Sequence, residues 1–170
     1  MNLQGEDFIE FAGIKITDNK LARIGWLLPT LTVLFSMSIH VISGHNRAIP
    51  FFISESDYPG LERWFFTIGF LSTGILQMFF AYRMWYSMRG NGRRKMMHLA
   101  LGCGIFTGAN LVVMSFANMY DYLSIHILTA SNVFNFGMLW ALFAHLSFPE
   151  ANSSGRKVRI WGIAIAFVSF

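Results

Sequence analysis

The chain has 170 residues, of which 54% are hydrophobic and only 13% are charged, and its mean hydropathy is +0.47. Soluble domains carry about 25% charged residues, so this composition excludes an ordinary globular surface and indicates walls that face lipid. The formal net charge of +4 is explained by the orientation rules of membrane proteins, without nucleic acid as a partner. The single cysteine, Cys103, excludes an intrachain disulfide and a metal site built from several cysteines.

Residues 1–23 are expected to form a cytoplasmic N-terminal tail. Apolar side chains at Phe8, Phe11 and Ile14 recur at three- to four-residue spacing, which predicts a short amphipathic helix at the membrane surface. A partly ordered tail explains the same mixture of acidic and apolar residues equally well.

Several long apolar runs follow the tail. The first two each contain 19 residues without Asp, Glu, Lys or Arg, close to the roughly 20 apolar residues that cross a bilayer. A fifth run begins at residue 160 and continues through residue 170, so we expect the chain to end inside a span. The sequence predicts an all-α polytopic transmembrane helix bundle over residues 24–170, with four full spans at 24–42, 64–82, 97–117 and 122–148.

Basic residues are distributed unevenly between the two sides of these spans. Eleven of them lie before the first span, between the second and third, or after the fourth, whereas only Arg47 and Arg63 lie on the other side. Because Lys and Arg accumulate in cytoplasmic loops, we predict a cytoplasmic N-terminus and an external loop at 43–63. The glycosylation sequon at Asn152 then lies on the cytoplasmic side and is expected to stay unmodified.

The external loop is expected to be an ordered lid. Pro50 favours extended backbone at the residue before it, and Phe51 and Phe52 are apolar enough to lie back on the bundle. Arg63 is expected to pair with a nearby acidic residue, for which Glu55, Asp57 and Glu62 are the candidates.

Histidines and carboxylates accumulate on the external side. Histidines and carboxylates that converge can hold zinc with an activated water, but none of the spacings matches a zinc-protease motif. Ordinary hydrogen bonds are the simpler interpretation, so we predict no metal, no cofactor and no assigned catalytic residue. The residues of this possible polar site are His40, His45, Asp121 and His126.

The interiors of the spans contain no Asp, Glu, Lys or Arg. This argues against a proton pump, an ion-coupled transporter or a voltage sensor, all of which need charge within the membrane. His126, Thr129, Asn132 and Asn135 recur every three residues, a row that either hydrogen-bonds to another helix or lines a ligand path. A small-residue face for close helix packing is predicted at Ala100, Gly104 and Gly108.

The loop after the second span is strongly basic. Each of its charges can attract an anionic lipid headgroup by about 1 kcal/mol, although the same charges also set the topology. The candidate headgroup residues are Arg89, Arg93, Arg94 and Lys95.

The external loop also carries a family signal. Pro50, Ile53, Ser54 and Glu55, followed by Tyr58 and Pro59 before the second span, resemble the Pro–x–Ile–Ser type motif of the DRAM/FRAG/SFK family, with one extra residue after the proline. The resemblance implies six spans with cytoplasmic ends. It also implies a non-catalytic modulator of autophagy or lipid biology in endomembranes (lysosomal or Golgi) or the plasma membrane. The paired loop cysteines of some members are absent.

Three classes of function follow from these observations. The leading one is a DRAM-like modulator that acts through membrane lipids or other membrane proteins. The alternatives are an accessory subunit of a larger membrane complex and a lipid-modifying enzyme with an external His/Asp site. Convergence of the four polar-site residues would favour the enzyme, whereas their dispersal, with aromatic walls facing lipid, would favour the modulator.

Overall fold

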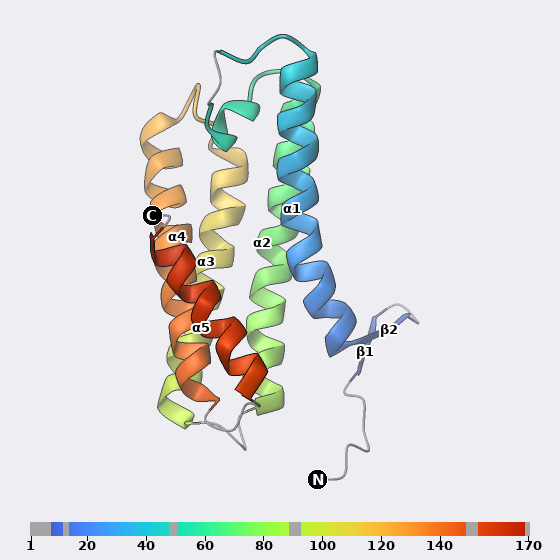
Figure 1. Ribbon diagram of the computed structural model, residues 1–170. Coiled ribbons are helices and arrows are strands. Elements are labelled where there is room, and N and C mark those ends of the chain that lie inside the picture. Colours follow the sequence, from blue (N-terminus) through green and yellow to red (C-terminus); the bar gives the residue numbers. More distant parts are fainter. Residues whose placement is uncertain (1–7, 12–13, 48–50, 89–92, 149–152, 169–170) are drawn as a thin grey trace.

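The computed structural model describes residues 8–11, 14–47, 51–88, 93–148 and 153–168. It confirms the all-α class, because four helices are long and apolar enough to cross a membrane. A shorter fifth helix, α5, runs from Ser153 to Val168 and packs beside α4 (Figure 1). The four long helices are α1 (Asp18–Ile42), α2 (Leu61–Met88), α3 (Arg94–Phe116) and α4 (Leu123–Ser147). The chain is therefore an integral membrane protein.

The N-terminal tail differs from the expected amphipathic helix. Strand β1 (Phe8–Phe11) pairs antiparallel with β2 (Ile14–Thr17), so that Phe8 lies opposite Thr17. β-branched residues favour a strand in this segment, and a helix this short is marginal on its own. Helix α1 begins directly afterwards, where the Thr17 hydroxyl accepts a hydrogen bond from the Lys20 N–H at 3.3 Å. The N-cap of α1 is thus Thr17.

Consecutive helices run in opposite directions and pack side by side, with α3 between α2 and α4 (Figure 1). The helix α2 extends beyond the expected span 64–82 at both ends. Toward the C-terminal end of α2 the Arg83 guanidinium lies 3.0 Å from an Asp18 carboxylate oxygen at the start of α1. This ion pair joins the two helices where each leaves the apolar layer.

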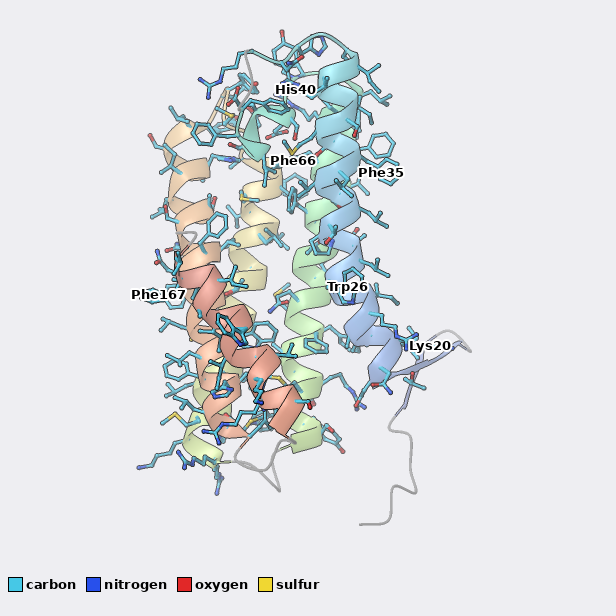
Figure 2. All side chains as sticks on the ribbon, in the orientation of Figure 1. Lys20, Trp26, Phe35, His40, Phe66 and Phe167 are labelled. Atoms are coloured by element: carbon cyan, nitrogen blue, oxygen red, sulfur yellow. The ribbon has the colours of Figure 1, made fainter. Side chains whose placement is uncertain are left out.

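The core lies in the half of the bundle next to loop 43–63. It is formed by Phe66 and Phe70 of α2 with Leu111 and Met114 of α3, and side chains of α1 and α4 pack against it. Phe66 is only 1% exposed, whereas Trp26 and Phe35 on the outer face of α1 are 60% and 54% exposed. Figure 2 labels both side chains along α1, and the Phe35 ring centre lies 6.3 Å from that of Phe65 on α2, also an exposed residue. Such exposed apolar side chains are suited to contact with lipid tails.

Small residues bring α2 and α3 together. A Cβ added to Gly108 would lie 2.6 Å from the Gly74 carbonyl oxygen, and one added to Gly104 would lie 2.6 Å from the Ala81 Cβ. Ala100, one turn before Gly104, is fully buried. The structure therefore places all three residues of the expected packing face inside the bundle, and both glycines directly against α2.

Candidate functional site

A short lid, formed by part of loop 43–63, covers one end of the bundle (Figure 1). Its centre is the 3₁₀ turn η1 (Ile53–Ser56), which begins where a Glu55 carboxylate oxygen accepts the Phe52 N–H at 2.8 Å. The same oxygen lies 2.7 Å from the Arg47 guanidinium. The Ser56 hydroxyl, fully buried, lies 3.1 Å from the Ser36 hydroxyl of α1. Over its described residues, loop 43–63 is thus ordered, and the hydrogen bond between Ser56 and Ser36 joins it to α1.

The family-motif residues have different roles in this lid. Ile53 is exposed and Ser54 is half-buried, and the Ser54 carbonyl accepts the Asp57 N–H at 3.2 Å. Glu55 is buried and makes the turn-stabilising contacts. Pro50 lies outside the described residues.

Two histidines and one glutamate converge beside the lid. His40 lies in the last turn of α1, His45 just after it, and Glu62 in the first turn of α2. The same Glu62 carboxylate oxygen lies 3.4 Å from Nδ1 of His40 and 2.6 Å from Nδ1 of His45. The His40 and Glu62 side chains are each 1% exposed, whereas His45 is 36% exposed. One face of the cluster is therefore open to water and the other is closed.

A buried aspartate lies next to this cluster. Asp57 is fully buried, and neither carboxylate oxygen accepts a hydrogen bond from the described residues. The pKa of Asp57 is raised to about 7, chiefly by burial; the Arg63 guanidinium opposes this rise, and the nearby Asp121 adds to it. Arg63 Nε lies 3.6 Å from the carboxylate and also donates to the Asp57 carbonyl at 3.3 Å. Of the three expected acidic partners, Asp57 is thus the one that pairs with Arg63.

The turn between α3 and α4 closes the other side of the lid. The Tyr120 hydroxyl donates to the Glu55 carbonyl at 2.9 Å, and its ring meets the Tyr58 ring edge-on at 5.3 Å. Burial, together with the nearby Glu55 charge, raises the pKa of Tyr120. This tyrosine was not identified in the sequence, because nothing local distinguishes it from the other interfacial tyrosines.

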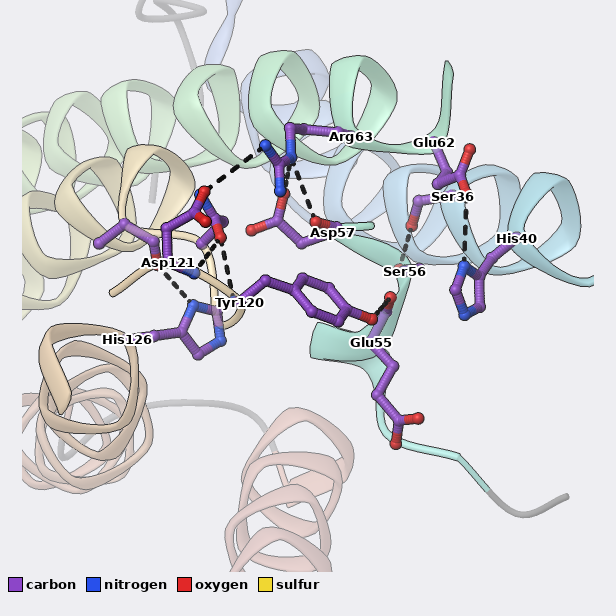
Figure 3. Close-up of polar contacts among 12 residues, drawn as sticks. Ser36, His40, Glu55, Ser56, Asp57, Glu62, Arg63, Tyr120, Asp121 and His126 are labelled. Atoms are coloured by element: carbon purple, nitrogen blue, oxygen red, sulfur yellow. Dashed lines mark hydrogen bonds and ion pairs between the residues drawn. The ribbon is translucent and has the colours of Figure 1, made fainter. Parts of the chain in front are cut away.

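The four expected polar-site residues do not form one site. His126 is buried, and its Nδ1 lies 2.7 Å from the Ala117 carbonyl, which braces the α3–α4 turn. Asp121 accepts a hydrogen bond from the Asn118 amide at 2.8 Å and lies 3.9 Å from Arg63. Figure 3 shows His126 and Asp121 on one side of the lid and His40 with Glu62 on the other. His40 and His45 therefore lie together with Glu62, which the sequence did not indicate as a member of the polar site.

The polar row of α4 wraps around the helix, as its three-residue spacing predicts. His126 and Thr129 are buried, Asn132 is half-buried and Asn135 is exposed. The Asn132 amide donates to Asn110 of α3 at 3.0 Å. Within the described residues this row bonds to its own helix, to the turn and to α3.

An apolar groove runs along α4 and α5 toward the end of the bundle opposite loop 43–63. Two adjoining hollows of about 260 and 310 Å³ form it and share Ala141, Gly162 and Ile163. Arg159 lines the second hollow, where its guanidinium lies 5.7 Å from the Phe148 ring centre. The groove thus combines an apolar wall with one cationic side chain.

Basic side chains gather near that end. Arg93, Arg94 and Lys95 are exposed, and the Arg93 N–H donates to the Ser147 carbonyl at 3.4 Å. This contact places the start of α3 beside the end of α4. Arg89, the remaining expected headgroup residue, lies outside the described residues.

No known protein family, curated protein or solved structure matches the chain. The resemblance to the DRAM/FRAG/SFK family therefore stays a prediction.

Proposed function

We propose that this chain is a non-catalytic membrane protein that binds an anionic phospholipid in the groove between α4 and α5. In this role it acts as a modulator through lipid contact, as the DRAM-like motif in its external loop implies. The observation that carries the proposal is the groove itself, an apolar channel at membrane depth with Arg159 along its wall.

The lining of the groove suits an acyl chain. Gly137 and Gly162 contribute no side chain to its wall, and a Cβ added to Gly162 would meet nothing within 4 Å. The remaining wall is mostly aliphatic or aromatic, with Val133, Phe134, Met138 and Ile163 among its members. A lipid tail can fill the hollow lined by these residues without covering a polar side chain.

The charge near the groove suits an anionic headgroup. Arg159 is half-buried in its wall, and the exposed Arg93, Arg94 and Lys95 begin the neighbouring helix. Each basic residue near the surface of an anionic leaflet contributes about 1 kcal/mol of attraction. A guanidinium also bonds a phosphate in a bidentate manner. A zwitterionic lipid would gain less from these charges.

The enzyme alternative has less support, because it required His40, His45, Asp121 and His126 to converge. His126 instead bonds to the Ala117 carbonyl, and Asp121 bonds to Asn118. These two groups brace a turn and leave no shared reaction centre with the other two.

The test is native mass spectrometry of the purified protein after exposure to vesicles containing phosphatidylserine or phosphatidylcholine. Gly162→Leu adds a side chain to the groove at a position where its Cβ meets no neighbour within 4 Å, and it is expected to remove the retained phospholipid. Arg159→Gln is expected to remove the preference for phosphatidylserine while leaving the tail bound. Gly25→Leu is the matched control, since Gly25 also has open space around it but lies on α1, away from the groove.

Equal lipid retention in the Gly162 variant and the wild type would refute the proposal. A stoichiometric co-purifying membrane protein, lost in the same variant, would instead favour the accessory subunit.

A further inference from the structure

The cluster at the end of α1 has the composition of a metal site. His40, His45 and Glu62 each offer one ligand atom, and the three atoms all lie within 4.8 Å of one another. We propose that these residues bind a zinc ion, which joins the end of α1, the external loop and the start of α2. This site is separate from the lipid groove and does not depend on the proposed function.

The donor set is one that zinc uses in proteins. Two imidazole nitrogens and one carboxylate oxygen supply three ligands, and sites of this kind keep a fourth position for water. His45 is 36% exposed, so the fourth position faces solvent. Glu62 is 1% exposed, and its buried negative charge is stabilised by a bound cation.

The geometry needs only small changes to accept the ion. A tetrahedral zinc with bonds of about 2.1 Å holds its ligand atoms roughly 3.4 Å apart. His40 Nδ1 and the Glu62 oxygen already lie 3.4 Å apart, whereas His45 Nδ1 lies 2.6 Å from that oxygen. To bind the ion, His45 must move away from Glu62 by less than about 1 Å and toward His40. His45 can make this movement because it belongs to a loop, which turns at Gly44 with φ of 72°. Each imidazole then coordinates through Nδ1, carries its proton on Nε2 and stays neutral, while Glu62 stays ionised.

Aromatic rings hold the two imidazoles in place. The Tyr58 ring centre lies 4.4 Å from that of His45 and 6.0 Å from that of His40, and the Phe51 ring lies 5.6 Å from His40. Packing of this kind fixes the side-chain rotamers, so less conformational entropy is lost when the ion binds. Because Tyr58 also contacts Tyr120, a bound ion stabilises the contact between the lid and the α3–α4 turn.

The competing interpretation is a hydrogen-bonded cluster without metal, in which both imidazoles donate Nδ1–H to Glu62. The two interpretations differ in metal affinity and in coordination. The full chain is purified with an affinity tag that contains no histidine, equilibrated with zinc chloride, desalted, and analysed by inductively coupled plasma mass spectrometry. One zinc per chain is expected, with two imidazole ligands in the X-ray absorption spectrum.

Substitutions test whether His45 is a ligand of the zinc ion. His45→Ala is expected to lower the zinc affinity, measured against a chromophoric chelator, by about 100-fold or more, since even outer-shell changes lower affinity 10- to 100-fold. His98→Ala is the control, because His98 is exposed and its Nδ1 contacts only the Arg94 carbonyl of its own helix. Zinc should also raise the melting temperature of the wild type, and a chelator should reverse this rise.

Zinc bound equally well by the wild type and the His45 variant would overturn the assignment, as would a wild-type protein that retains no zinc. If the His45 variant fails to fold, the absorption spectrum and the melting temperature of the wild type still decide the question. Loss of zinc binding with lipid binding intact would leave the proposed function standing, and the reverse result would leave the zinc site standing.

Discussion

The contact between α2 and α3 allows a sharp test of the packing, through the substitution Gly108→Ala. The added Cβ would lie 2.6 Å from the Gly74 carbonyl oxygen and 2.5 Å from Met78 Cγ. Met78 can move, but the carbonyl belongs to helix backbone, so the contact must lengthen by about 0.8 Å to reach ordinary van der Waals distance. Separating two packed helices in this way destabilises a core by typically 1–3 kcal/mol.

Gly102→Ala on the same helix is the matched control, because a Cβ at Gly102 meets nothing within 4 Å. Replacing a helical glycine by alanine stabilises by roughly 0.5–1 kcal/mol where space allows. Because both variants share this gain, they should differ by the packing cost alone, about 1–3 kcal/mol in the free energy of unfolding. The measurement is unfolding in mixed micelles by titration with sodium dodecyl sulfate. A Gly108 variant as stable as the Gly102 variant would show that the helices do not approach as closely as described.

Two further predictions concern the polar side chains of Asp57 and Asn132. Asp57 has a pKa raised from 3.8 to about 7, so between these values the folded chain holds a proton that the unfolded chain has lost. Stability should therefore fall as the pH rises from about 4 to about 7, by at most about 4 kcal/mol. Melting curves of Asp57→Asn should not show this fall in stability with rising pH. Parallel pH profiles of stability for the variant and the wild type would contradict the raised pKa. Asn132→Leu removes the bond to Asn110 and should destabilise by about 0.6 kcal/mol in mixed-micelle unfolding, whereas Asn135→Leu, at an exposed position, should have little effect.

The membrane-spanning architecture follows from the sequence because it depends on local composition. A run such as residues 24–42, without a charged side chain, has few stable environments other than the bilayer. The ends of the helices were less predictable. Helix α2 continues to Met88, beyond the apolar run, because a helix already formed adds further turns at little free-energy cost.

The N-terminal segment shows where local patterns fail. Phe8, Phe11 and Ile14 suggested a helix, yet the backbone pairs as a hairpin. The β-branched residues beside them favour extended backbone, and periodicity in so short a segment cannot separate the two. The same limit applies to the Pro–x–Ile–Ser type motif, since its spacing reveals nothing about which side chains meet.

By itself, the sequence determined the helical class, the four apolar stretches long enough to cross a membrane and the polar character of loop 43–63. Only the tertiary structure decided that His40 and His45 meet at Glu62, while His126 bonds to the Ala117 carbonyl instead. The physical reason is that these contacts join separate elements, whose relative rotation depends on packing at places such as Gly74 and Gly108. A side chain's partner across two helices depends on that rotation, which composition and spacing along one helix do not encode.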